Sequence, residues 1–209
     1  MTLPPDLGHT TYCSYICIVR GGKVLINSGL GSEGDGIDSN GYILIDGGEV
    51  ISAANPTADT GLDADTATII DGGNVFSVGC SMDMASSQSS QPTMNLIFSS
   101  TVAASSTLTI KDSNGNEITS FCANDADFQS GTSRRTYSAA VVSHTSFSAN
   151  SVYHLYLDGT QLGYTGNSSS SSGPGGKGSS GSGSSSSTIT TDFTLGSSAT
   201  TFSGVQKAL

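Results

Sequence analysis

The stretches GIDSNGYILIDGGEVIS (36–52) and GLDADTATIIDGGNVFS (61–77) decide the fold, because the second repeats the pattern of the first 25 residues later. An earlier Gly-Gly pair opens the run GGKVLI (21–26), 26 residues before the pair at 47–48. A constant period of this length with glycine at the corners is typical of one coil of a β-solenoid. We therefore predict stacked columns formed by Val24, Val50 and Val75 and by Ile45 and Ile70.

A run of antiparallel hairpins is the alternative interpretation of the same strands and glycines. Hairpins have no reason to keep one spacing, because their loops are independent of each other. The constant spacing instead favours an all-β fold in which residues 20–98 form a right-handed parallel β-helix of few coils. Residues 1–19 resemble no coil and remain unassigned.

After Met82 the period stops and the sequence favours antiparallel strands. Thr107–Ile110 and Glu117–Phe121 flank an Asn-Gly pair at 114–115, which is a strong hairpin signal. Further strands are predicted at Tyr137–Val142, which pairs with Val152–Leu157, and at Thr188–Leu195.

The open end of a solenoid needs a cover, so residues 99–209 are predicted to form an antiparallel β cap. Residues 166–187 within it are nearly all Ser and Gly. Such a segment has no apolar side chains to bury, so we predict a disordered loop there.

Charge restricts the possible partners. The chain has 209 residues with 7 Lys and Arg against 17 Asp and Glu, a formal net charge of -10. Nucleic acid is excluded as a partner because phosphate binding requires a basic face. Membrane insertion is not expected, since no apolar run approaches the roughly 20 residues that span a bilayer. Oligomeric state is not indicated by the sequence.

The segment GDGIDSNG (34–41), followed by a strand and then DGG (46–48), resembles the carbohydrate-binding parallel β-helix family first noted in cellulolytic clostridia. The hairpin DSNGNEI (112–118) and the run Tyr153–Gly159 followed by a Gly-rich loop are similar to the C-terminal part of that domain. The resemblance implies binding of cellulose or acidic pectic sugars, with calcium held at turns of the helix.

Acidic corners are the candidate metal site. Asp and Asn side chains recur in the turns of adjacent coils, and Ca²⁺ prefers six to eight such oxygen ligands. The alternative is that these side chains only close their own turns through bonds to the backbone. The predicted calcium ligands are Asp35, Asp38, Asn40, Asp59, Asp63 and Asp65.

A non-catalytic role is expected because no recognisable nucleophile motif surrounds His9, His144 or His154. Arg134-Arg135 is the only basic pair. The chain has no Trp, so tyrosine rings would have to stack on a sugar. The alternation of side chains along the strands places about half of these tyrosines in the core. The candidates are Tyr42, Tyr137, Tyr153, Tyr156 and Tyr164.

Calcium-assisted binding of a plant cell-wall polysaccharide is therefore the predicted function. A pectate-lyase-like polysaccharide lyase is one alternative, but Arg20 and Lys23 are the only basic residues in the coils, and a lyase needs a base beside its calcium. A structural or adhesive surface module is another.

A polysaccharide ligand implies an extracellular or cell-surface location. No signal peptide is recognisable at the N-terminus, so we expect the export signal upstream or the chain to be a fragment. The four cysteines fit no zinc pattern, and their spacing leaves disulfides or thiols open.

Overall fold

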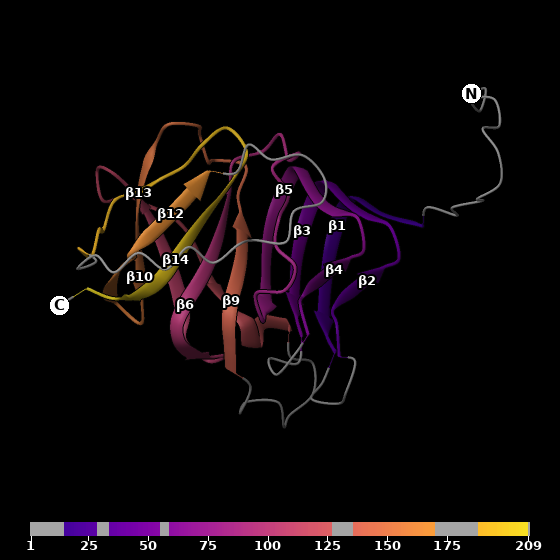
Figure 1. Ribbon diagram of the computed structural model, residues 1–209, viewed down its shortest axis with the longest axis horizontal. Helices are drawn as coiled ribbons and strands as arrows, with labels where there is room; N and C mark the ends of the chain where they lie inside the picture. The colour runs from indigo at the N-terminus through magenta and orange to yellow at the C-terminus, as the bar shows by residue number, and fades with distance from the viewer. Residues whose placement is uncertain (1–14, 29–33, 55–58, 127–135, 170–187, 209) are drawn as a thin grey trace.

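A computed structural model of the chain describes residues 15–28, 34–54, 59–126, 136–169 and 188–208. Its strands form an all-β fold with one short 3-10 helix, η1, at Ala123–Ala126. Figure 1 shows the repeats on one side of the molecule and the later strands on the other. No helix of the described part is long and apolar enough to cross a membrane.

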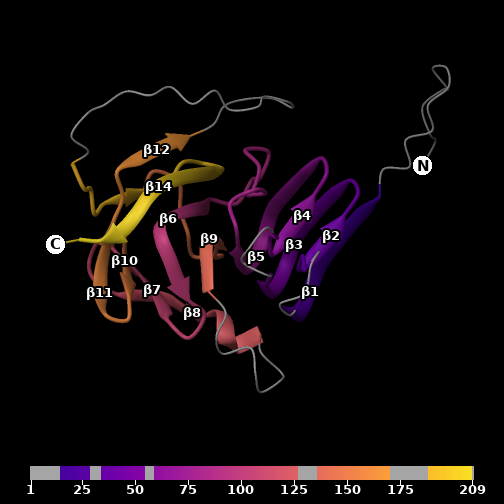
Figure 2. The ribbon, with the colours of Figure 1, turned by 60° about the horizontal axis from the view of Figure 1, so that its bottom comes forward.

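The repeats form parallel strands that lie side by side (Figure 2). Strands β1 (Ile16–Asn27), β3 (Tyr42–Ala53) and β5 (Ala67–Gly79) pair in parallel, and so do the short strands β2 (Ile37–Ser39) and β4 (Leu62–Ala64) of a second sheet. The alternative of antiparallel hairpins in this stretch is therefore wrong.

The predicted columns are confirmed by the strand register. Val24 lies opposite Val50, which lies opposite Val75, and Ile45 lies opposite Ile70. These side chains form one apolar cluster with Ile37 and Leu62 of the facing short strands. Alternation along each strand sends the next residues, Leu25, Ile51 and Phe76, to the opposite face, where they join a second cluster.

Strand β1 begins earlier than the predicted coil. Ile16–Val19 pair with Tyr42–Ile45, so these residues belong to the repeat and not to the unassigned segment. Residues 16–19 are a continuous apolar run with no polar alternation, and β1 is the edge strand of the sheet. Ile16 is 53% and Ile18 40% exposed.

Glycine is required where each long strand bends. Gly48 and Gly73 have φ of +90° and +87°. A Cβ on Gly48 would lie 2.8 Å from the backbone of Gly21, and one on Gly73 would lie 2.7 Å from the carbonyl oxygen of Gly48. The Gly-Gly pairs therefore allow both the bend and the close stacking of successive bends.

The later strands continue the same sheet. Strand β9 lies between β5 and β6 and is antiparallel to both, while β6 is parallel to β14. The predicted boundary between residues 98 and 99 falls inside β6 and does not coincide with a break in the sheet. The bounds are β6 Thr93–Ala103, β7 Thr107–Asp112, β8 Glu117–Cys122, β9 Thr136–Ser143, β10 Val152–Leu157, β11 Thr160–Gly163, β12 Gly166–Ser169, β13 Phe193–Thr194 and β14 Ala199–Lys207.

The predicted hairpin is confirmed as β7 and β8, but other details of the cap differ. Strand β9 does not pair with β10, because β10 lies against β7, β11 and β13. The predicted strand at Thr188–Leu195 is reduced to the two residues of β13, and the main C-terminal strand is β14. Strand β14 pairs with β6, β11 and β12, and no local sequence pattern indicates these long-range contacts.

The predicted loop at 166–187 begins four residues too early. Residues 166–169 form β12, which pairs with Thr200–Ser203 of β14. Residues 170–187 lie outside the described part of the chain. Cys17, Cys80 and Cys122 are free thiols, and Cys13 lies outside the described residues.

Candidate functional site

A column of polar side chains crosses the three parallel strands just after the Gly-Gly bends. Lys23 of β1 lies opposite Glu49 of β3, which lies opposite Asn74 of β5. Because side chains alternate between the two faces of a strand, this column shares its face with the apolar column of Leu25, Ile51 and Phe76.

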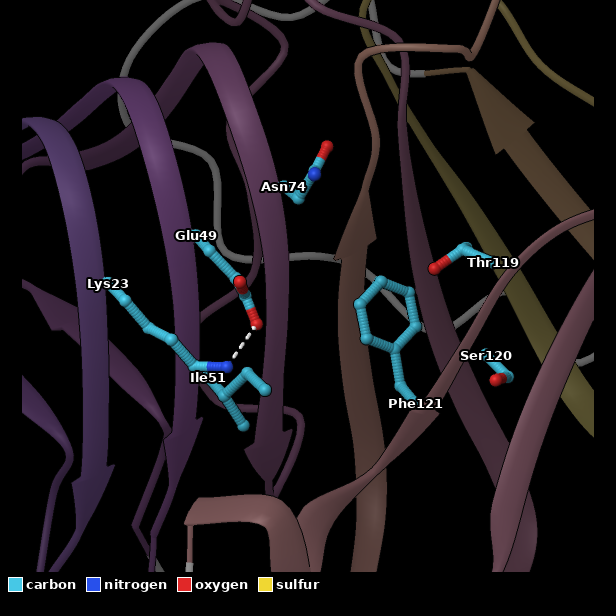
Figure 3. Close-up of a pocket in the computed structure, with 7 residues that line it drawn as sticks. All are labelled: Lys23, Glu49, Ile51, Asn74, Thr119, Ser120 and Phe121. Carbon is cyan, nitrogen blue, oxygen red and sulfur yellow. Dashed lines mark ion pairs between the residues drawn. The ribbon is translucent and has the colours of Figure 1, made fainter.

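The β7–β8 hairpin supplies the opposite wall. Phe121 of β8 stacks on Phe76 with ring centroids 4.9 Å apart and planes 11° from parallel. This contact fixes Thr119 and Ser120 across from the polar column, as Figure 3 shows. Between the two walls runs a groove of about 370 Å³.

The charges in the groove balance. Lys23 Nζ lies 3.0 Å from Glu49 Oε1, and the two side chains are 56% and 42% exposed. The amide oxygen of Asn74 accepts bonds from the backbone N–H and the hydroxyl of Thr145, at 3.1 and 3.3 Å. The same amide also carries two N–H donors.

The lining is chemically mixed. Ammonium, carboxylate, amide and hydroxyl groups are donors and acceptors for hydroxyl-rich ligands, while Ile51 and Phe121 offer apolar surface. No His or Cys is among the described residues that line the groove. The arrangement suits recognition by hydrogen bonds and apolar contact, the two elements of most small-ligand sites.

Two of the predicted calcium ligands connect neighbouring repeats. Asp35 accepts a hydrogen bond from the backbone N–H of Thr60 at 2.7 Å, and Asp59 accepts one from the N–H of Gly34 at 2.9 Å. Asp35 and Asp59 thus bond to backbone N–H groups, as the turn-forming alternative predicted. Each carboxylate, however, accepts its bond from a neighbouring repeat rather than from its own turn.

Asp38 and Asp63 stack as predicted, since they are opposite each other on β2 and β4. The pKa of Asp63 is raised to about 7, first by burial, then by a hydrogen bond to Asp83 and by the charges of Asp83, Asp35 and Asp38. Asp83 was not among the predicted ligands, because it lies outside the repeat and no periodic pattern includes it.

The six predicted ligands are not drawn into one coordination shell. Asn40 and Asp65 are exposed. Within the described ranges, no group of three or more His, Cys, Asp or Glu side chains is arranged to hold a metal ion. The oxygen chemistry near Asp63 fits a hard cation, and the geometry provides the carboxylate pair Asp63–Asp83 rather than a closed site.

The acidic corner is separate from the groove, because none of the six predicted ligands lines it. Asp38 and Asn40 instead line a shallow depression of about 300 Å³ beside Tyr15, which is 61% exposed.

Most of the tyrosines considered for sugar stacking are not available. Tyr137, Tyr153 and Tyr164 are buried in the core. The ring of Tyr156 is covered by Lys111, whose Nζ lies 5.0 Å from the ring centroid. Tyr42 is partly buried on β3. Phe121 lines the groove but is itself only 6% exposed, so it offers a ring edge rather than a stacking face.

The remaining candidates have structural partners. His154 lies 3.0 Å from Asp192 Oδ1, and Arg20 lies 3.4 Å from Asp46. Burial lowers the pKa of His144. His9 and Arg134-Arg135 lie outside the described residues.

Comparisons with protein-family models, with curated proteins and with solved structures gave no match for this chain.

Proposed function

We propose that the protein binds a carbohydrate without acting on it, and that the groove between the parallel strands and the β7–β8 hairpin is the binding site. The groove supports this proposal because it combines balanced charges with amide and hydroxyl groups, beside small apolar edges of the mostly buried Ile51 and Phe121. Sugars present the matching combination of hydroxyl groups and apolar C–H faces.

The arrangement of Lys23 favours binding over lyase chemistry. A lyase needs a base placed to remove a proton, and an amine can accept that proton only in its neutral form. Among the described residues that line the groove, Lys23 is the one basic side chain, and it is ion-paired with Glu49.

We further propose that the repeats are coils of a right-handed parallel β-helix related to the carbohydrate-binding family of cellulolytic clostridia. The parallel pairs in two sheets, with a constant offset, support this assignment. A plant cell-wall polysaccharide, cellulose or an acidic pectic sugar, is the expected ligand, and its location implies an extracellular or cell-surface protein.

Calcium is proposed to assist by neutralising the acidic corner. The negative charges of Asp83, Asp35 and Asp38 disfavour the ionised form of Asp63. A divalent cation bound only to the folded protein would stabilise it by mass action. Since these residues are outside the groove, calcium is expected to act on the stability of the repeats rather than directly on a sugar bound there.

Affinity electrophoresis in gels containing polygalacturonate or a soluble cellulose derivative tests the binding proposal. We expect slower migration in at least one gel, and no absorbance from unsaturated sugar products. Normal migration in every gel would reject carbohydrate binding, and product absorbance would establish the lyase instead.

Melting curves recorded with calcium and with chelator test the proposed role of calcium. Millimolar calcium should raise the melting temperature, and Asp38→Ala should abolish the rise. Asp46→Ala is the matched control, because Asp46 lies in the same repeat but pairs with Arg20. A melting temperature that does not change when chelator is added would exclude a structural calcium.

A further inference from the structure

The polar column of the groove has the regular spacing of the sheet. Lys23, Glu49 and Asn74 occupy equivalent positions on three adjacent strands. Neighbouring strands lie about 4.8 Å apart. One hydrogen-bonding side chain is therefore presented per strand, at a step comparable to the length of one sugar ring in an extended glycan.

The other direction across the groove offers no such series. Along β3, the residues that follow Glu49 on the same face are Ile51 and Ala53, which are apolar and buried. On β3, polar side chains of this face therefore do not recur along the strand, whereas they recur from strand to strand, along the direction in which the repeats stack.

Apolar contact follows the same direction. Ile51 belongs to the column next to Glu49, and Phe121 is held against the end of that column by its stacking on Phe76. A ligand lying along the polar column would be held mainly by hydrogen-bonding groups, while Ile51 and Phe121, which are 5% and 6% exposed, would add a small apolar contact.

The two ends of the column differ. At β5, Asn74 is bonded to Thr145, which follows β9 and bounds the column. At β1, the column reaches the edge of the sheet. A polymer could therefore end near Asn74 or leave the groove past Lys23.

We infer that the groove binds an extended linear glycan lengthwise across β1, β3 and β5, with one sugar residue per strand recognised by Lys23, Glu49 and Asn74. This inference rests on the carbohydrate-binding function proposed above and specifies its ligand class as a polymer segment rather than a single sugar. In this binding mode, the spacing between neighbouring strands determines where each sugar residue lies along the groove.

Calorimetric titration with cello-oligosaccharides and oligogalacturonates of one to six units tests the length dependence. Affinity should rise about fivefold with each unit up to three, since each new sugar gains about one net hydrogen bond. It should then change little, because three strands carry the column. A monosaccharide that binds as tightly as the trimer, or an affinity that climbs steadily to six units, would overturn the inference.

Substitution of the column provides the second test. Lys23→Met should weaken trimer binding about tenfold, the usual effect of losing a hydrogen bond to a charged group. Arg20→Met is the matched control, because Arg20 lies on the same strand and pairs with Asp46, but does not line the groove. Asn74→Ala should likewise weaken the trimer more than the monosaccharide.

The outcomes separate this inference from the general function. If glycans bind but Lys23→Met and Arg20→Met behave alike, the lengthwise mode is wrong and carbohydrate binding stands at another surface. If no oligosaccharide of either series binds and both polymers fail in gels, the proposed function fails as well.

Discussion

At the scale of single residues, the Gly-Gly bends impose the strictest demand on the sequence. Gly22 and Gly48 share a positive φ, +78° and +90°. They differ in surroundings, because nothing lies within 4 Å of a Cβ built on Gly22, whereas the backbone of Gly21 lies 2.8 Å from one on Gly48. Substitution of Gly22 therefore measures backbone strain alone, whereas substitution of Gly48 measures strain together with steric conflict.

We predict that Gly22→Ala lowers the free energy of unfolding by about 1 kcal/mol, the usual cost of a positive φ at a residue with a Cβ. Gly48→Ala should cost clearly more, because two backbones must also move apart. Urea denaturation of both variants measures the difference. Equal losses would mean that stacked bends tolerate a Cβ.

Asp63 gives the protein a dependence on pH. A carboxyl with a pKa near 7 in the folded state and 3.8 when unfolded binds its proton more tightly when the protein is folded. The stability from this proton is complete below about pH 4 and is lost as the pH rises through 7.

Asp63→Asn should therefore become increasingly more stable than the wild type between pH 5 and pH 8, because the amide cannot ionise. Asp83→Asn should act in the same direction by removing the neighbouring charge. Denaturation at three pH values measures this, and a constant difference between variant and wild type would show that the cluster is not repulsive.

At the scale of elements, Phe121 connects the hairpin to the repeats. It is 6% exposed and stacked on Phe76. Phe121→Ala should cost about 3 kcal/mol or more, the lower end for a buried Phe reduced to Ala. Phe121→Leu, which retains most of the volume, should cost much less. Near-wild-type denaturation of Phe121→Ala would mean that the hairpin is not packed on the repeats.

Some of the elements could be predicted from the sequence, and others could not. The parallel strands were predictable because Val24, Val50 and Val75 repeat at a fixed offset, and the β7–β8 hairpin because its Asn-Gly turn is local. The pairing of β9 with β5 and β6 was not, since it joins residues such as Val142 and Phe76 that no local pattern relates.

The candidate site was only partly predictable for the same reason. Lys23 was recognised as a basic residue of the repeats, and the stacking of Asp38 on Asp63 followed from the period. The groove itself depends on Thr119, Ser120 and Phe121 arriving from a distant hairpin. The approach of Asp83 to Asp63 is likewise a tertiary contact.

At the scale of the whole molecule, one sheet unites a regular stack of repeats with an irregular, mostly antiparallel half. The groove lies where the two halves meet, between side chains of β1, β3 and β5 and those of β8 (Figure 3). We therefore expect the proposed carbohydrate binding to require both halves, and blocking the junction should remove it.

Calorimetric titration of a Ser120→Trp variant with the longest soluble glycan that the wild type binds tests this claim most directly. Ser120 is exposed and lines the groove, so a large ring there should fill it without disturbing the core. Ser113→Trp, at the exposed tip of the same hairpin, is the control. We predict that Ser120→Trp loses binding while both variants melt like the wild type; wild-type affinity in a folded Ser120→Trp variant would contradict the groove as the carbohydrate site.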